Sequence, residues 1–196
     1  MAYNQLVTST GESVNALGGA ERDQIISQLH GRKYTQAASG NLYGITGGLT
    51  TTTAAGAATF TGLAVGNATG SGYNLAVHKV FISQGAALTA ETELGIMYGP
   101  GSIAASLTTI FNRKASGTVP TTITATAGAT ITAPTAFIVI AGSGSGAITV
   151  PGVIPVCSAD FEGGVIIPPG YFFASYTSRV TTTALVFSFE FELIAI

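Results

Sequence analysis

The stretch Leu185-Val186-Phe187-Ser188-Phe189-Glu190-Phe191-Glu192-Leu193-Ile194, near the C-terminus, carries the clearest structural pattern of this 196-residue chain. Its odd-numbered positions are all Leu or Phe, whereas its even-numbered positions mix Val, Ser, Glu and Ile. Strict alternation of this kind is typical of a β-strand with one apolar and one mixed face. Burial of each Phe would contribute about 1.5–3 kcal/mol, so the pattern predicts a strand that lies centrally in a sheet.

Similar runs recur from about residue 46 onward. Segments rich in β-branched and aromatic residues, bounded by Gly, Pro, Ser and Asn, predict roughly nine or ten strands. The expected strands cover residues 58–65, 75–83, 94–98, 106–111, 122–131, 136–141, 147–156, 164–167, 171–177 and 183–194. With almost no helical pattern beside them, these strands predict an all-β fold, an antiparallel sandwich or barrel.

Residues 1–45 differ from the rest and are interpreted as an N-terminal arm, with residues 46–196 forming the β-body. The arm holds six charged side chains, Glu12, Glu21, Arg22, Asp23, Arg32 and Lys33. Residues 20–29 are the best helix candidate, because Ile25, Ile26 and Leu29 would form an apolar stripe that Gly31 ends. So short a helix is not stable alone, so we expect the arm to lie on another surface.

Charged residues make up only 8% of the chain, against about 25% in typical soluble domains. Residues 34–78 and 115–159 contain no Asp, Glu, Lys or Arg at all. Free monomers usually stay apart by means of charge, so the composition favours a subunit that is covered by other subunits. The net charge of −2 provides no basic field for nucleic acid, and a single Cys157 excludes an intrachain disulfide.

No targeting or membrane-spanning segment is expected. The N-terminal residues lack a basic region followed by an apolar one, as a signal peptide requires. The most apolar window, 137–156, is interrupted by four Gly and two Pro residues, whereas a spanning helix needs about 20 continuous apolar residues. We therefore expect synthesis in a cytoplasm and no membrane partner.

Glu190 and Glu192 share one strand face, which could place paired carboxylates as glycoside hydrolases use them. We favour a solvated or interfacial strand face, because catalytic carboxylates usually come from different strands and the chain has no Trp to stack a sugar. Asp160 and Glu162 lack the regular oxygen ligands of calcium loops and are interpreted as a plain turn.

The remaining candidates for chemistry also have structural interpretations. His30 and His78 lack the spacing of known metal motifs, and Cys157 lacks the surroundings of a catalytic thiol. The glycine-rich runs at 66–72 and 142–146 match no phosphate-binding motif and are interpreted as turns between strands. We therefore predict no catalytic residue, no metal and no cofactor, and thus no enzyme.

Short motifs rich in Gly and small residues are spread over the chain. In order, these are GRKY at 31–34, GNLY at 40–43, TGLAVGNATGSGYNL at 61–75, VFI at 80–82 and IPPG at 167–170. Together they resemble structural proteins of tailed bacteriophages, and more narrowly capsid cement (decoration) proteins, from about residue 31 to the C-terminus. The high Thr and Ala content and the short charged arm depart from that family.

The resemblance implies a jelly-roll-like sandwich that forms a homotrimer on the outside of a virion capsid, assembled in the host cytoplasm. It implies that the protein bridges subunits of the major capsid protein, without catalysis or a cofactor. Other virion roles, such as a head fibre base, a tail protein or an adaptor, remain alternatives, as does a carbohydrate-binding sandwich. The apolar residues expected to bind the partner are Tyr3, Leu6, Val7, Leu17, Ile25, Ile26, Leu29, Tyr34, Leu42 and Tyr43.

Overall fold

The computed structural model describes residues 5–7, 13–15, 33–47, 50–52, 62–86, 88, 90–103, 110–127, 133–143, 156–179 and 181–196. The chain divides into two compact units, Met1–Thr35 and Gln36–Ile196. In the first unit, strands β1 (Gln5–Val7) and β2 (Ser13–Asn15) form a two-stranded antiparallel sheet in which Leu6 lies opposite Val14. The helix expected over residues 20–29 lies outside the described residues.

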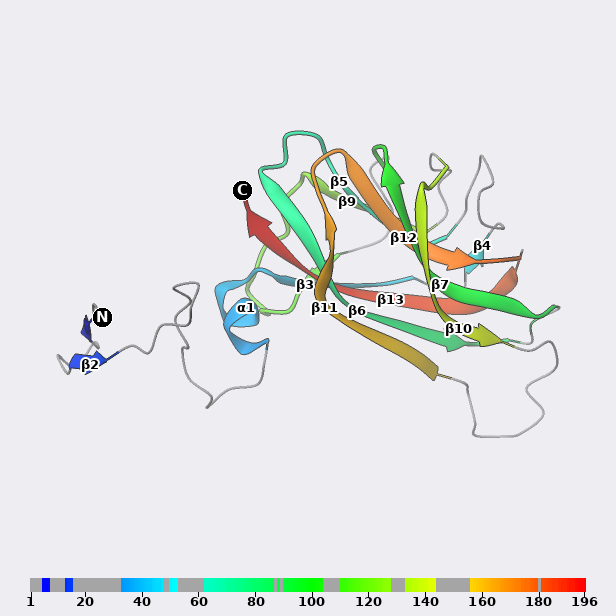
Figure 1. Ribbon diagram of the computed structural model, residues 1–196, viewed down its shortest axis with the longest axis horizontal. Coiled ribbons are helices and arrows are strands. Elements are labelled where there is room, and N and C mark those ends of the chain that lie inside the picture. The colour runs from blue at the N-terminus through cyan, green and yellow to red at the C-terminus, as the bar shows by residue number, and fades with distance from the viewer. Residues whose placement is uncertain are drawn as a thin grey trace. The chain divides into compact units, whose positions relative to one another are not determined.

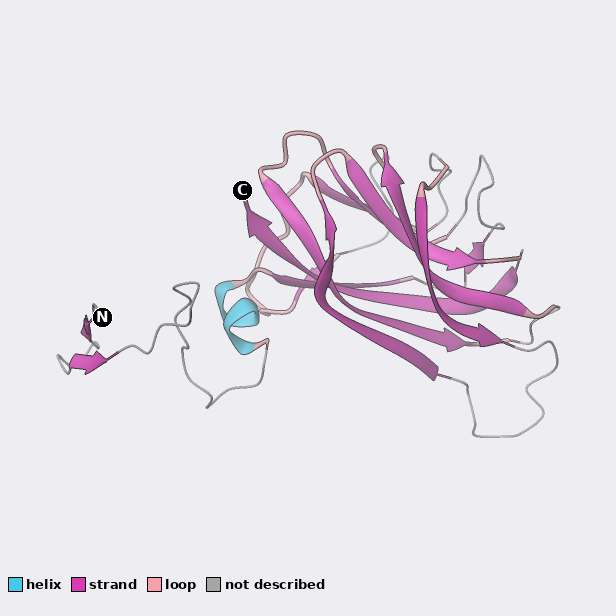
Figure 2. Cartoon of the chain, in the orientation of Figure 1, coloured by secondary structure: helices cyan, strands magenta, loops and turns pink. Residues whose placement is uncertain are grey.

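The second unit is a sandwich of two antiparallel sheets (Figures 1 and 2). One sheet has the order β11 (Val156–Ile167), β6 (Tyr73–Gln84), β13 (Thr181–Ala195), β3 (Leu42–Thr46) and β8 (Phe111–Asn112), and β4 (Thr50–Thr52) also pairs with β13. We call it the six-stranded sheet. The five-stranded sheet has the order β10 (Ala136–Ser143), β7 (Thr92–Pro100), β12 (Tyr171–Thr177), β5 (Ala64–Asn67) and β9 (Ile123–Thr126). The predicted antiparallel β-sandwich is confirmed, with α1 (Tyr34–Ser39) as the one helix within the described ranges.

Strand β13 occupies the centre of the six-stranded sheet, as its sequence pattern predicts. It pairs with β6 on one side and with β3 and β4 on the other. Phe187, Phe189 and Phe191 are all buried, while the intervening Ser188 and Glu190 are partly exposed. The alternation in the sequence therefore corresponds to one face in the core and one face turned outward.

Aromatic rings join the two sheets across the core. Phe173 of β12 lies 4.9 Å from the Phe189 ring and 6.0 Å from the Phe191 ring, measured between centroids. Within the six-stranded sheet, Tyr43 of the neighbouring strand β3 stacks on Phe191 of β13, with centroids 5.8 Å apart. Such pairs stabilise a core beyond the area that they bury.

Two features differ from the sequence-based expectation. The compact body begins at Gln36 instead of residue 46, because β3 pairs with β13. Asp160 and Glu162, expected in a plain turn, lie within β11, where the chain makes a bulge between Asp160 and Val165 instead of a turn between strands. Parts of the strands expected over 58–65, 106–111, 122–131 and 147–156 lie outside the described residues.

Candidate interaction surfaces

Most of the charged side chains of the body lie in, or directly after, strands of the six-stranded sheet. In register, Lys79 of β6 lies between Asp160 of β11 and Glu190 of β13. Arg113, just after β8, forms an ion pair with Glu190 through Nη2 and Oε2 at 3.1 Å. We call these residues, together with His78 and Glu192, the charged strip.

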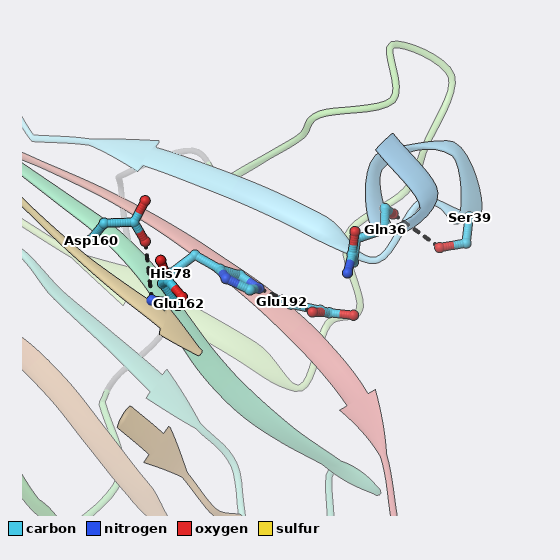
Figure 3. A network of polar contacts seen from close by, with 6 residues as sticks. All are labelled: Gln36, Ser39, His78, Asp160, Glu162 and Glu192. Atoms are coloured by element: carbon cyan, nitrogen blue, oxygen red, sulfur yellow. Dashed lines mark hydrogen bonds and ion pairs between the residues drawn. The ribbon is translucent and has the colours of Figure 1, made fainter. Parts of the chain in front are cut away.

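A β-bulge places His78 in the charged strip. The strands on both sides of β6, β11 and β13, change register at His78. Lys79 is opposite Asp160 of β11 and Glu190 of β13, whereas Val77 is opposite residues that come after the register shift in each of these strands. His78 is therefore the extra residue of β6, and bulges of this kind turn a side chain to a new direction. Its Nε2 lies 3.0 Å from Oε2 of Glu192, and Figure 3 shows the two side chains directed toward one another.

Strand β11 bulges where it passes His78. Its backbone N–H at Glu162 donates to the Asp160 carboxylate at 3.0 Å (Figure 3), and both Glu162 and Gly163 have positive φ angles, 54° and 83°. A Cβ at Gly163 would lie 3.6 Å from the His78 ring. The bulge of β11 thus lies against the bulge of β6. Within the described part of the chain, no group of three or more His, Cys, Asp or Glu residues could hold a metal ion.

The residues considered for catalysis have partners within the fold. Glu190 pairs with Arg113 and Glu192 with His78, so each carboxylate of the suspected pair has its own partner. Cys157 of β11 is partly buried, and burial raises the pKa of its thiol, which disfavours the nucleophilic thiolate at neutral pH.

The five-stranded sheet is nearly free of charge. Strands β5, β9, β10 and β12 contain no Asp, Glu, Lys or Arg, and β7 contains only Glu93. Both faces of its central strand β12 are buried and uncharged. Phe173 points into the core between the sheets, while Phe172, Ala174 and Tyr176 alternate with it and belong to a second buried cluster with Ala64, Met97 and Ile103. A strand without charge on either face is typical of a position in which both faces are covered.

The edge strand β10 exposes large apolar side chains. Phe137 is 59% exposed and Val139 is 45% exposed, whereas Ile138 and Ile140 pack against the core. The Phe137 ring stacks on Tyr176 of β12, with centroids 5.2 Å apart. In register, Tyr176 lies opposite Gly95 of β7 and Phe137 lies opposite Met97, so the two rings meet diagonally across β7. We call Phe137 and Val139 the β10 patch.

Tyr176 also has a polar partner at this side of the sheet. Its phenol donates to the Glu93 carboxylate at 3.3 Å. Burial, followed by the hydrogen bond and the negative charge of Glu93, raises the pKa of Tyr176 above its ordinary value of 10.0. The neutral phenol is therefore the form that the fold stabilises.

The residues predicted to bind a partner fall into four groups. Tyr34 on α1 is 53% exposed. Leu42 and Tyr43 are each 4% exposed, so their side chains are buried in the body and are not available on its surface. Their burial follows from the pairing of β3 with β13. Leu6 and Val7 lie in β1, and Tyr3, Leu17, Ile25, Ile26 and Leu29 lie outside the described residues.

Sequence reasoning identified β10 as a strand but did not single out its exposed patch. Residues 136–141 read AFIVIA, a continuous apolar run that predicts a strand but does not reveal which face meets the core or that the strand lies at an edge. In the part of the chain that the structure describes, no helix is long and apolar enough to cross a membrane.

No protein-family model, curated protein or solved structure matches this chain.

Proposed function

We propose that this protein is a structural subunit of a virion, and specifically a capsid cement protein that binds the outside of a major capsid shell and bridges its subunits. The five-stranded sheet carries the proposal, because it is almost without charge and exposes Phe137 and Val139 at its edge. Charge and its solvation normally keep a monomer soluble. A neutral surface with exposed large apolar side chains is instead typical of a protein that another protein covers.

The resemblance of the motifs supplies the class of partner. Cement proteins lie on icosahedral shells, and the resemblance also implies a jelly-roll-like connection of the strands and a homotrimer that forms on the shell. The separate N-terminal unit, Met1–Thr35, supports the idea of an arm that reaches a neighbouring subunit. A two-stranded sheet such as β1–β2 is at best marginally stable in isolation, so contact with a partner would stabilise it.

Electron cryomicroscopy of the virion that carries this protein tests the proposal. We expect density for the β-sandwich on the outer capsid surface, in hundreds of copies per particle. A few tens of copies or fewer, at a vertex or in the tail, would instead support a head fibre, tail or adaptor subunit. Absence of the protein from purified particles would refute a virion role altogether.

Deletion of residues 1–30 tests the arm separately. The compact body starts at Gln36, so we expect the truncated protein to keep its β-sandwich and its circular dichroism spectrum. Its binding to undecorated shells should be abolished, because the apolar residues of the arm are missing. Full occupancy of shells by the truncated protein would show that the arm does not make the contact.

Salt dependence tests the character of the interface. Glu190 pairs with Arg113 and Glu192 with His78 within the six-stranded sheet, and the described strands of the five-stranded sheet carry only Glu93, so few ionic contacts remain for a partner. Salt screens exposed ionic contacts over about 8–10 Å at physiological strength but leaves apolar contacts intact. We expect binding to shells to change little with added NaCl, and release by moderate salt alone would contradict a neutral interface.

A further inference from the structure

We infer that the open edge of β10 is a two-fold contact surface on which a second copy of this chain adds its own β10. The joined strands would make one continuous sheet from the five-stranded sheets of both copies. This inference concerns the isolated protein and does not depend on the proposed capsid role. It follows from a comparison of the sheet edges and from the residues on β10.

Other sheet edges in the described body carry features that discourage pairing with another chain. Strand β11 has Asp160 and Glu162 and the large bulge beside His78. Strands β8 and β9 are only two and four residues long. Charges, bulges and short length are the usual means by which proteins protect an edge from association.

Strand β10 has little of this protection. It is eight residues long, contains no charged residue and no proline, and keeps a regular register with β7 from Ala136 to Val139. Among the described strands, β7 is its one hydrogen-bonded neighbour, so its other side is an edge. An uncharged edge with exposed Phe137 and Val139 is a surface on which a strand can add.

A second β10 matches this edge on both faces. An added strand must be apolar toward the core, apolar on the outer side and free of charge along its length. In an antiparallel pair, opposite residues share a face, so a two-fold axis brings Ile138 to the inner side of both copies and Phe137 and Val139 to the outer side. Aromatic and β-branched side chains form favourable cross-strand pairs.

The protected edges at β11, β8 and β9 are poor partners for β10. Pairing with β11 would place Asp160 and Glu162 against an uncharged strand, and β8 and β9 are too short to cover it. Among the described edges, β10 is therefore the best partner for a second β10. Contact between identical surfaces is the geometry of a closed two-fold dimer. The register shift between Val139 and Ala141 keeps the paired region short, so we expect a dimer that dissociates on dilution.

Sedimentation equilibrium of the full-length chain over a range of protein concentrations tests this inference. We expect a monomer–dimer equilibrium, and we expect Val139→Lys to weaken the dimer at least tenfold. The two introduced lysines would lie on the same outer face close to the axis, directly opposite or diagonal to one another, and like charges so placed destabilise a strand pair. The matched control is Ile166→Lys, a similarly exposed apolar position on β11 (47% exposed), which should leave the dimer constant unchanged.

A second measurement guards against misfolding of the lysine variant. Hydrogen exchange of the wild-type chain should show amides of residues 136–139 becoming protected as the concentration rises, with β11 unaffected. A wild-type monomer at all concentrations would overturn the inference. A trimer that Val139→Lys leaves intact, or equal losses in Val139→Lys and Ile166→Lys, would also overturn it. Failure of the protein to bind capsids would leave all these readouts unchanged.

Discussion

Substitution of Phe189 by Ala removes the ring that joins the two sheets at the centre of the sandwich. Phe189 is 1% exposed, lies on the central strand β13, and packs on Phe173 at 4.9 Å and on Phe187 at 6.4 Å between centroids. Truncation of a buried Phe to Ala typically lowers the free energy of unfolding by about 3–5 kcal/mol. Because a domain is stable by only about 5–15 kcal/mol, this one change should remove a large part of the stability.

The loss is measurable by two independent methods. Urea denaturation should show a lower midpoint with an unchanged slope, because the surface exposed on unfolding hardly changes. For a domain of this size, each kcal/mol shifts the melting temperature by about 2–4 °C, so we expect a decrease of roughly 6–20 °C. Ser188→Ala on the outward face of the same strand is the control, and its stability should stay within about 0.5 kcal/mol.

A double-mutant cycle with Phe173→Ala identifies the part that the ring contact contributes. Aromatic pairs in cores couple by about 0.5–1.5 kcal/mol beyond the buried area. A loss below about 1 kcal/mol in Phe189→Ala, or no coupling between the two positions, would refute the assignment of these rings to the core between the sheets.

Three further changes probe other parts of the sandwich. Gly95→Ala should destabilise the body by about 1–3 kcal/mol, because its Cβ would overlap the backbone of β10, whereas Gly142→Ala, with nothing within 4 Å, should be neutral in the same denaturation assay. The raised pKa of Tyr176 means that above pH 10 the unfolded chain loses the phenol proton more readily than the folded chain. Stability should therefore fall as the pH rises through about 10, and the melting temperature of Tyr176→Phe should fall less steeply; an identical slope would contradict this. Arg113→Ala should cost about 0.2–1 kcal/mol through its ion pair with Glu190, an effect that 1 M NaCl should reduce; a loss that is insensitive to salt would argue for packing instead.

Local pattern in the sequence was sufficient for β13. Alternation with a period of two depends only on neighbouring residues, so the strand, its buried face and its central place could all be predicted from Phe187, Phe189 and Phe191. The near-absence of charge could also be read directly from the sequence. The division of the chain into a sheet with a charged strip and a nearly neutral second sheet could not be predicted, because local sequence does not determine the order of strands.

Strand β3 shows where local pattern fails. Residues 42–46 read LYGIT, a short run interrupted by Gly44, and their strand conformation follows from pairing with β13. A Cβ at Gly44 would lie 2.7 Å from the Phe111 ring, so this glycine admits a ring from a distant segment. The contact between His78 and Glu192 spans 114 residues and depends on a bulge that the sequence does not mark.

The clearest contrast is between one phenylalanine in an alternating strand and one in a continuously apolar strand. Phe189 of β13 is buried, whereas Phe137 of β10 is mostly exposed although residues 136–141 are all apolar. The alternation in β13 marks its core face, but a continuous apolar run such as β10 does not mark either face. Burial of Phe189 follows from a central strand facing another sheet, whereas exposure of Phe137 follows from an edge strand whose outer face is open. That difference arises from long-range pairing, and it creates the surface on which both proposals depend.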